Sequence, residues 1–363
     1  MKPLFVNGVR AELSSNTLAT CIRDTFLAAS DNCSWLHSGD VVLLKPALNS
    51  PDPYPSTTHP LAIRVVADLL EERGAKVVIG DQSGIGHVLH HKGGVIRGSS
   101  RANYAHAGMG SFDDPQFVSF EDGGWDEGFY HHQSQNTASW QSGFFITTWA
   151  KKVDHIVCLP RVSAHSQAGA TLGLKCMVGM LREDSRMEFH ANGPYNKSIT
   201  DLAKGSALVS HDDGTKLFFE KIVEISDAIR KKLRVTLVVA TKAQATFGPD
   251  RFGIQVGPVG LGRAYVTSPK PGLVFASPDQ VAAEALALAL LKDLKTRVPF
   301  FPKLSERILL YQNRNVQDLL AIPVRDHPFI RHAKNIGLGE MPREIVYANV
   351  PQEVQDRLNL ALH

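Results

Sequence analysis

The chain has 363 residues, of which 43% are hydrophobic and 21% charged, and its formal net charge is +3. These values are typical of a soluble globular protein, and so small a charge excludes the strongly basic proteins that bind nucleic acids electrostatically. No apolar run approaches the roughly 20 residues of a membrane span, and the N-terminal sequence lacks the apolar core of a secretory signal. We therefore expect a cytoplasmic protein, with two lobes because of its length.

The first elements in chain order are predicted to form a βαβ unit. The runs VVLLKP (41–46) and AKVVIGD (75–81) are typical of buried strands, and apolar residues recur at helical spacing over 61–70. Pro60 suits the first turn of this helix and Gly74 its end. The two strands should therefore be parallel neighbours in one sheet.

Polar residues follow the carboxyl ends of both predicted strands. Ligands of α/β proteins lie beyond such ends, so Asp81 is a candidate catalytic group, and Lys45 and Ser83 are candidate cofactor contacts. As a cleft carboxylate, Asp81 would contribute little to stability. The alternative is that Asp81 only caps the turn, and that Thr57 or Thr58 caps the helix that follows.

The pattern weakens between residues 85 and 142, where Gly, His, Asp and aromatic residues dominate. So long a stretch with weak periodicity is typical of a functional insertion or a lid. It contains the pairs His90/His91 and His131/His132. Adjacent histidines point in different directions in most backbone conformations, so we favour loop histidines at the surface over metal ligands.

Alternation of strands and helices resumes after this insertion, which predicts an α/β fold of mostly parallel, doubly wound sheets. We expect an N-terminal lobe of residues 1–150, including the insertion, and a second lobe of residues 151–363, with a ligand cleft between them. The glycine-rich loop 247–263 matches neither a P-loop nor a dinucleotide fingerprint, so a backbone contact to an anion and a plain turn both stay open. Further strands and helices are expected at 144–149, 155–160, 215–232, 233–240, 272–277, 279–293 and 327–340.

The segment KKVDHIVCLPRVSAHSQAGATLGLKCMVGMLREDSRMEFH (151–190) is the most informative part of the chain. Its apolar stretch at 168–181 carries one lysine, Lys175, and predicts a buried helix. A buried ammonium is costly unless it has a partner or loses its proton, so a carboxylate, a phosphate or a covalent bond should compensate it. His165 precedes Lys175 at a turn, and His190 closes the segment.

This set of two histidines and one lysine is the leading candidate site. Its chemistry would be acid–base catalysis, metal ligation, or covalent catalysis by a lysine whose pKa burial lowers. The structural alternative is a core lysine paired with Asp184 or Glu188, beside two histidines with ordinary hydrogen bonds.

The four cysteines (Cys21, Cys33, Cys158 and Cys176) are scattered, and no C-x-x-C pair occurs. An iron–sulfur cluster needs about four cysteine ligands brought together, and a disulfide framework is not expected at this length. We therefore expect no iron–sulfur cluster.

Several stretches, in order from about Val41 to Gly339, together resemble the family called domain of unknown function 362. The most specific is the element H-S-x-A-G-x-T-L-x-L-K at 165–175. The resemblance names no activity, and many members of the family carry a ferredoxin-like cysteine cluster that this chain lacks. The matching stretches are VLLKPALNSPDPYPSTTHP, GAKVVIGDQSG, DHIVCLPRVSAHSQAGATLGLKCMVGMLR, GPVGLG, GLVFASPDQVAAEALA and IRHAKNIGLG.

The spacing of His165, Lys175 and His190 is also similar to that in the nickel-pincer lactate racemase family. That likeness implies that the lysine tethers the pincer cofactor, that His190 binds nickel and that His165 is an acid/base. The second catalytic histidine of that family, in a T-G-x-H-R turn, has no counterpart here, because GDQSG (80–84) stands in its place. The likeness therefore extends to the site and not to the racemase reaction.

We expect an enzyme that acts on a small anionic substrate, using a bound metal or a group attached to Lys175, in an isomerase-, racemase- or lyase-like reaction. The catalytic residues would be His165, Lys175 and Asp81, with Arg182 as a further cofactor contact. The alternative is a non-catalytic binding or carrier module for an anion or a metal. Neither nucleic acid nor membrane is expected as a partner, and a homo-oligomer stays open.

Overall fold

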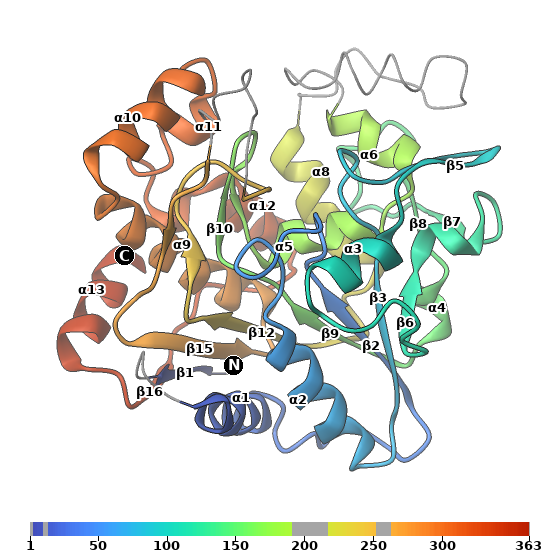
Figure 1. Ribbon diagram of the computed structural model, residues 1–363, viewed down its shortest axis with the longest axis horizontal. Helices are drawn as coiled ribbons and strands as arrows, with labels where there is room; N and C mark the ends of the chain where they lie inside the picture. Colours follow the sequence, from blue (N-terminus) through green and yellow to red (C-terminus); the bar gives the residue numbers. More distant parts are fainter. Residues whose placement is uncertain (1–2, 10–13, 191–216, 252–262, 363) are drawn as a thin grey trace.

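An eight-stranded sheet runs through the centre of the molecule (Figure 1). The computed structural model describes residues 3–9, 14–190, 217–251 and 263–362. Strand β15 is antiparallel to both of its neighbours, and the other neighbouring strands are parallel. In spatial order the strands are β16 (Ile345–Ala348), β1 (Leu4–Val9), β15 (Gly272–Ser277), β12 (Leu233–Ala240), β9 (His155–Leu159), β2 (Val41–Pro46), β3 (Lys76–Asp81) and β6 (Phe117–Ser119).

Helices cover both faces of this sheet, which confirms the predicted α/β fold. Alternate residues of a strand point to opposite faces, so Val42 and Leu44 of β2 share a core with α1 and α2, whereas Leu43 belongs to the core on the other face, with α9. The described helices are α1 (Ser15–Ala29), α2 (Pro60–Glu71), α3 (Ser100–His106), α4 (Trp149–Lys152), α5 (Gly173–Cys176), α6 (Glu183–His190), α8 (Phe218–Glu224), α9 (Gln280–Thr296), α10 (Phe300–Leu309), α11 (Arg314–Gln317), α12 (Pro328–Asn335) and α13 (Gln352–Leu362). The described 3-10 turns are η1 (Phe120–Gly123), η2 (Met177–Met180), η3 (Ile225–Ala228) and η4 (Val324–Asp326).

The predicted βαβ unit is confirmed, with one change at the start of its helix. Strands β2 and β3 pair in parallel and flank α2 in sequence. The cap of α2 is His59, whose Nδ1 accepts a hydrogen bond from the Leu61 amide at 3.1 Å, rather than either threonine before it. Thr58 instead accepts a bond from the Ala47 amide at 2.8 Å and donates one to the Leu159 carbonyl. Its hydroxyl therefore ties the end of β2 to the end of β9.

The stretch 85–142 has regular structure and supplies one strand of the central sheet. Strand β6 lies within it and pairs in parallel with β3. Residues 117–119 are therefore part of the central sheet, and not of an insertion or lid as expected. The rings of Tyr104 and Phe117 are buried and stack with their centroids 4.1 Å apart, joining α3 to β6. The remaining strands of the stretch form parts of two hairpins, β4 (Leu89–His91) with β5 (Gly94–Arg97), and β7 (Phe129–His132) with β8 (Phe144–Thr147).

A second sheet has four short strands, in the order β11-β10-β13-β14. Strands β10 and β11 form a hairpin, so that Ser163 faces Thr171 and His165 faces Gly169. The strands are β10 (Ser163–His165), β11 (Gly169–Thr171), β13 (Ala243–Gln244) and β14 (Val266–Thr267).

Strands from both predicted lobes share the central sheet. β2, β3 and β6 precede residue 150, whereas β9, β12, β15 and β16 follow it, and β1 lies between β15 and β16. Ladder pairing joins β2 directly to β9 across the predicted boundary. The division into residues 1–150 and 151–363 thus has no counterpart in the sheet, and the arrangement in two lobes stays a prediction.

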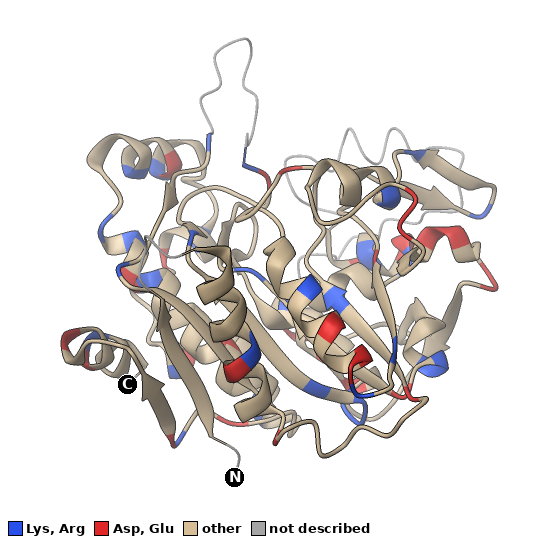
Figure 2. Ribbon diagram, turned by 60° about the horizontal axis from the view of Figure 1, so that its bottom comes forward, with Lys and Arg blue, Asp and Glu red and all other residues tan. Residues whose placement is uncertain are grey.

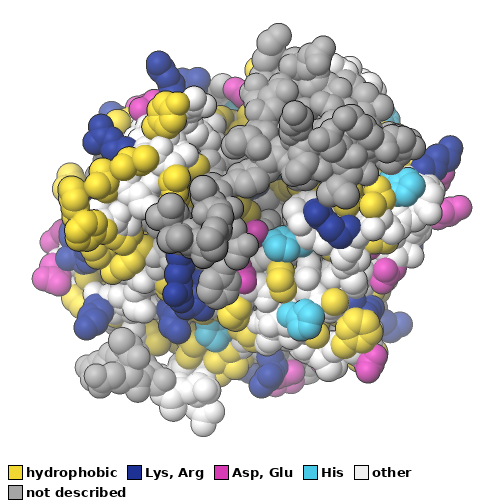
Figure 3. Space-filling model, turned by 45° about the horizontal axis from the view of Figure 1, so that its top comes forward, with side chains coloured by type: hydrophobic (Ala, Val, Ile, Leu, Met, Phe, Trp, Pro, Cys, Tyr) yellow, Lys and Arg dark blue, Asp and Glu magenta, His cyan; other side chains and the backbone are white. Residues whose placement is uncertain are grey.

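Charged residues occur in many elements around the sheet rather than in one part of the ribbon (Figure 2). Apolar side chains collect at the left of the face shown in Figure 3, where α10 exposes Phe300, Phe301 and Ile308. No helix in the described part of the chain is long and apolar enough to span a membrane.

A fragment of residues 1–150 produced alone should fail to fold, because β2 would lose β9 and β1 would lose both β15 and β16. Circular dichroism during urea denaturation should show no cooperative transition for the fragment, whereas the full chain should unfold in a single transition. A dispersed amide spectrum and a sharp transition for the fragment would instead establish an independent N-terminal lobe.

Candidate functional site

Three neighbouring parallel strands end at one edge of the central sheet, and each delivers a charged residue there. Asp81 is the last residue of β3, Lys45 is the penultimate residue of β2, and Arg161 follows β9 by two positions. Since β3 pairs with β2 and β2 with β9, these residues leave the sheet side by side. The predicted meeting of Lys45 and Asp81 at this edge is confirmed.

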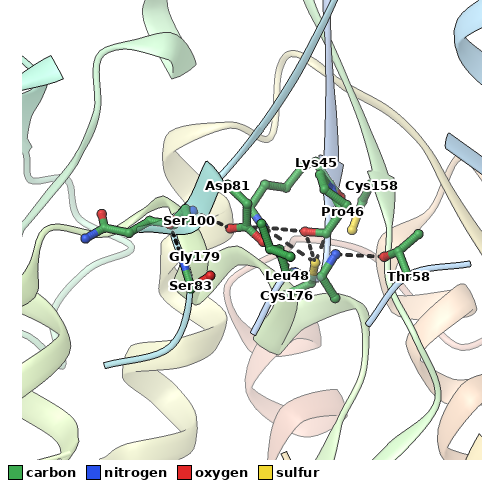
Figure 4. A network of polar contacts seen from close by, with 12 residues as sticks. Lys45, Pro46, Leu48, Thr58, Asp81, Ser83, Ser100, Cys158, Cys176 and Gly179 are labelled. Atoms are coloured by element: carbon green, nitrogen blue, oxygen red, sulfur yellow. Dashed lines mark hydrogen bonds and ion pairs between the residues drawn. The ribbon is translucent and has the colours of Figure 1, made fainter. Parts of the chain in front are cut away.

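Lys45 and Asp81 form a buried ion pair (Figure 4), with the lysine Nζ 2.7 Å from Asp81 Oδ1. The carboxylate also accepts hydrogen bonds of 2.8 Å from the amides of Leu48 and Gln82. Burial opposes the charge on Lys45, but the Asp81 carboxylate outweighs it and raises the pKa of the lysine. A side chain at Gly179 would clash with Asp81, so η2 lies directly against this pair.

These contacts differ from the expectation that Lys45 emerges into an open cleft, because its side chain is 0% exposed. Both groups have their partners within the protein, and the pair joins two strand ends to η2. Roles for Lys45 and Asp81 in ligand binding stay predictions. Their positions favour a structural part in holding the site together.

The predicted long helix at 168–181 is wrong, although the burial expected of this stretch is confirmed. Residues 169–171 form β11, and the chain becomes helical only at α5, which passes into η2. Gly169 has φ +76°, a conformation that glycine adopts without strain, and it opens β11 opposite His165. The hairpin therefore displaces the first turns of the expected helix and places Lys175 one residue before the end of α5.

Lys175 differs from the other buried lysines. Lys45, Lys221 and Lys295 each lie within 3.0 Å of a carboxylate, supplied by Asp81, Glu188 and Glu306. Lys175 is only 8% exposed, yet no described residue gives it a hydrogen bond or an ion pair. Burial, and then the positive charges of Arg161 and Arg186, lower its pKa to about 7.

The structural alternative for Lys175 therefore finds no support. Asp184 binds Arg182 through both of its oxygens, at 3.0 and 2.7 Å. Glu188 binds Lys221 at 3.0 Å. Both proposed carboxylates are thus occupied elsewhere, and the amine of Lys175 has no counter-charge of its own among the described residues.

Arg161 is a second buried cation without a partner, and the sequence analysis did not single it out. Its side chain is 0% exposed, and none of its three nitrogens makes a hydrogen bond with a described residue. Burial lowers its pKa to about 10 against the opposing effect of carboxylates such as Asp250 and Asp52, so the guanidinium is still charged at neutral pH. Buried polar groups in folded proteins nearly always have partners, and an unpaired buried charge is costlier still.

Arg186 completes the positive cluster but has partners of its own. Its guanidinium donates to the carbonyls of Ser83 at 2.6 Å, Gln82 at 3.1 Å and Gly179 at 3.0 Å. Ser83 in turn donates its amide to Ser100 Oγ at 2.9 Å. Ser83 thus holds Arg186 through its backbone, and direct contact between its hydroxyl and a cofactor stays a prediction.

The two histidines near Lys175 are held in opposite tautomers. Nδ1 of His165 accepts bonds from the amides of Gln167 at 3.0 Å and Ala168 at 3.1 Å, so the neutral ring carries its proton on Nε2. Nδ1 of His190 lies 2.9 Å from the Arg186 carbonyl, which can only accept, so the neutral ring leaves Nε2 unprotonated. One histidine presents a donor and the other an acceptor.

The charge of Lys175 contributes to the low pKa values of both histidines. Burial, followed by the charges of Lys175, His190 and Arg161, holds the pKa of His165 well below its usual range. Burial and then Lys175 lower the pKa of His190 to about 3. Both rings are therefore neutral at physiological pH.

Arg182, the other predicted cofactor contact, lies in a different environment. Besides Asp184 it donates to the Trp125 carbonyl at 3.1 Å, and its guanidinium lies 3.5 Å from the centroid of Phe145. These contacts satisfy its charge and hold β8 against the start of α6. A cofactor role for Arg182 stays a prediction without a contact in its favour.

No group of three or more His, Cys, Asp or Glu residues in the described ranges could hold a metal ion. In the second histidine pair, His131 contacts the Ser142 carbonyl and His132 contacts Asp227. His90, in β4, is buried rather than exposed in a surface loop as expected. Its Nδ1 lies 3.7 Å from Glu183 Oε2. Metal binding by His190 therefore stays a prediction.

Two contributors to the site were missed by sequence analysis. Arg161 had one usable signal, since it directly follows Pro160 at the carboxyl end of a buried strand. Glu284 of α9 had none, because nothing local marks it as a partner of α5. It accepts a hydrogen bond from the Leu174 amide at 2.8 Å, and burial raises its pKa to about 8. It fixes the start of the short helix that carries Lys175.

Comparison with known families supports the resemblance noted from the sequence. The model described as Domain of unknown function (DUF362) matches residues 42–289, more than half of the chain. No curated protein and no solved structure matched the chain. The matched range includes every residue of the cluster around Lys175. The glycine-rich loop 247–263, for which an anion contact and a plain turn both stay open, lies mostly outside the described residues.

Replacing Asp81 by asparagine should destabilise the fold by about 3–5 kcal/mol, because the buried charge of Lys45 would lose its partner. Urea denaturation followed by fluorescence measures this change. The double variant Lys45→Met/Asp81→Leu should recover much of the loss, because it removes both charges. Asp326→Asn, at an exposed position, serves as the control and should change stability by less than about 0.5 kcal/mol. If Asp81→Asn lowers the free energy of unfolding by no more than the control Asp326→Asn does, the ion pair is not structural.

Proposed function

The chain belongs to the family described as Domain of unknown function (DUF362), and from this premise we propose that it is an enzyme acting on a small anion bound at Arg161. Proton transfer by the groups around Lys175 would carry an isomerase-, racemase- or lyase-like reaction. The observation that supports this most is the buried guanidinium of Arg161, which lacks any hydrogen-bond partner. Pro160, the residue before Arg161, lies against the first residue of α5, the helix that carries Lys175.

A bound anion would supply what the cluster lacks. The guanidinium presents a planar set of donors that matches a carboxylate or a phosphate in two parallel hydrogen bonds. Arg161, Arg186 and Lys175 add positive charge, while the charge of Asp81 is compensated by Lys45. An anion at this place would therefore gain strong, weakly screened attraction.

The two histidines suit opposite roles toward such a ligand. His165 would donate its Nε2 proton in a hydrogen bond and stabilise negative charge on a substrate oxygen. His190 would accept a proton at Nε2. Its low pKa in the free protein arises from burial and from the charge of Lys175, and a bound anion would raise that pKa. Substrate binding would thus make His190 a better base.

The groups implied by the racemase likeness receive limited support. The Lys175 amine has no competing partner among the described residues, so it could carry an attached group. The described donors do not fit a metal centre, because no three ligands gather there. The proposal therefore routes no step through a metal.

The alternative function is a carrier or binding module that takes up the anion without turnover. Exchange of carbon-bound hydrogens of a substrate with solvent distinguishes an enzyme from a carrier. The protein incubated in heavy water with pyruvate or lactate should replace carbon-bound protons by deuterium, seen as loss of proton NMR signals. His190→Gln should abolish the exchange while sulfate still binds, and Arg307→Gln on the surface should exchange normally. Sulfate binding with no exchange of any tested carboxylate would support the carrier.

Sulfate affinity should depend on pH through Lys175, whose pKa is about 7. Below that pH the free protein already carries the ammonium, and binding is strongest. Above it the amine is neutral, so the bound anion must draw in a proton, and the affinity falls by up to about tenfold per pH unit. Titration calorimetry from pH 6 to 9 measures this. Lys175→Met should bind more weakly with little dependence on pH, and a wild-type affinity that does not change with pH would contradict the assignment.

A further inference from the structure

The amine of Lys175 is placed as a nucleophile rather than as a counter-ion. The other buried lysines are engaged by carboxylates, whereas no described group occupies the Lys175 amine. Lys175 lies on α5, and a side chain at Gly173, the first residue of that helix, would lie 3.8 Å from the ring of Pro160, the residue before Arg161. The segments that carry the two cations are therefore in contact, and the charge of Arg161 adds to burial in lowering the pKa of Lys175. A lysine desolvated beside another cation keeps a large neutral fraction near neutral pH, which is the form that attacks carbonyl carbon.

We infer that Lys175 forms an imine with a 2-oxo carboxylate whose carboxylate group is bound by Arg161. This inference rests on the proposed function and names the substrate class for the same site. The carboxylate fits the unpartnered guanidinium. The carbon next to it must then lie near Lys175, and that carbon is electrophilic only when it bears a carbonyl oxygen. A phosphate ester supplies no such carbon.

The step is balanced by the groups already present. The Lys175 nitrogen adds to the carbonyl carbon, a carbon–nitrogen double bond forms, and the carbon–oxygen double bond breaks. Both hydrogens of the amine leave with the carbonyl oxygen as water. No oxidant or reductant is needed.

The histidine tautomers match the two sides of this step. His165 Nε2 carries the hydrogen that can stabilise the carbonyl oxygen as it gains negative charge. His190 Nε2 is unprotonated and can relay protons from the Lys175 nitrogen to the departing carbonyl oxygen. In the resulting imine the protons on the next carbon become more acidic, so His190 could also remove one of them. This gives the proton-transfer chemistry of the proposed function a defined intermediate.

Reductive trapping tests the inference on the intact wild-type protein. Pyruvate with cyanoborohydride should add one reduced pyruvate unit, found by intact mass, and peptide mapping should place it on Lys175. Acetone, which lacks the carboxylate, should react at least about tenfold more slowly, because it loses the charge-assisted bonds to Arg161. Excess sulfate should protect Lys175 by occupying the same cation. Lys175→Arg should give no adduct, whereas Lys303→Arg, at an exposed lysine, should be labelled as the wild type is.

Sulfate binding, measured on the same samples, distinguishes failure of the inference from failure of the proposed function. If sulfate binds and pyruvate leaves no adduct on Lys175, the imine is overturned while the anion site stands. If acetone and pyruvate label Lys175 equally, the claim that Arg161 binds the substrate carboxylate is overturned. If neither sulfate binding nor labelling occurs, the proposed function fails together with the inference.

Discussion

Burying positive charge is the constraint on which the rest of this structure depends. Transfer of an ammonium or guanidinium out of water is affordable only with a counter-charge or dense hydrogen bonding. The fold provides this for Lys45, Lys221 and Lys295 through carboxylates, and for Arg186 through three carbonyls. Among the described residues it provides neither a hydrogen bond nor an ion pair for Arg161 or Lys175. We propose that this difference separates groups that stabilise the fold from groups that bind a ligand.

The architecture explains why the two unpaired cations meet. Parallel strands β3, β2 and β9 end at one edge, and the Lys45–Asp81 pair closes that edge against η2. The chain leaving β9 therefore turns Arg161 inward, and the β10–β11 hairpin returns it to α5 and Lys175. Burial, followed by the positive charges of the neighbouring groups, lowers the pKa values of Lys175 and both histidines. A bound anion would offset the contribution of those charges and so raise the pKa values.

Much of the fold could be predicted from the sequence, because local patterns determine it. The βαβ unit followed from buried strands and an amphipathic helix, and α12 (Pro328–Asn335) lies within the range 327–340 where an element was expected. The helix expected at 168–181 was wrong because apolar periodicity cannot distinguish a buried hairpin from a buried helix. The burial of Lys175 was predictable from its neighbours in sequence, whereas Arg161 was missed because its isolation depends on which side chains fail to reach it. The carboxylate of Glu284 reaches α5 from 110 residues away, a contact that no local pattern encodes.

The central claim is that Arg161 is unpaired within the protein and is completed by an anion. The most direct test is the free energy of unfolding of the wild type and of Arg161→Met, each measured by urea denaturation with and without sulfate at constant ionic strength. The account predicts that without sulfate the variant is at least as stable as the wild type, because it no longer buries an unpaired charge, and that only the wild type gains stability from sulfate. A variant several kcal/mol less stable than the wild type without sulfate, with no specific gain from sulfate in the wild type, would show that Arg161 has its partner inside the protein.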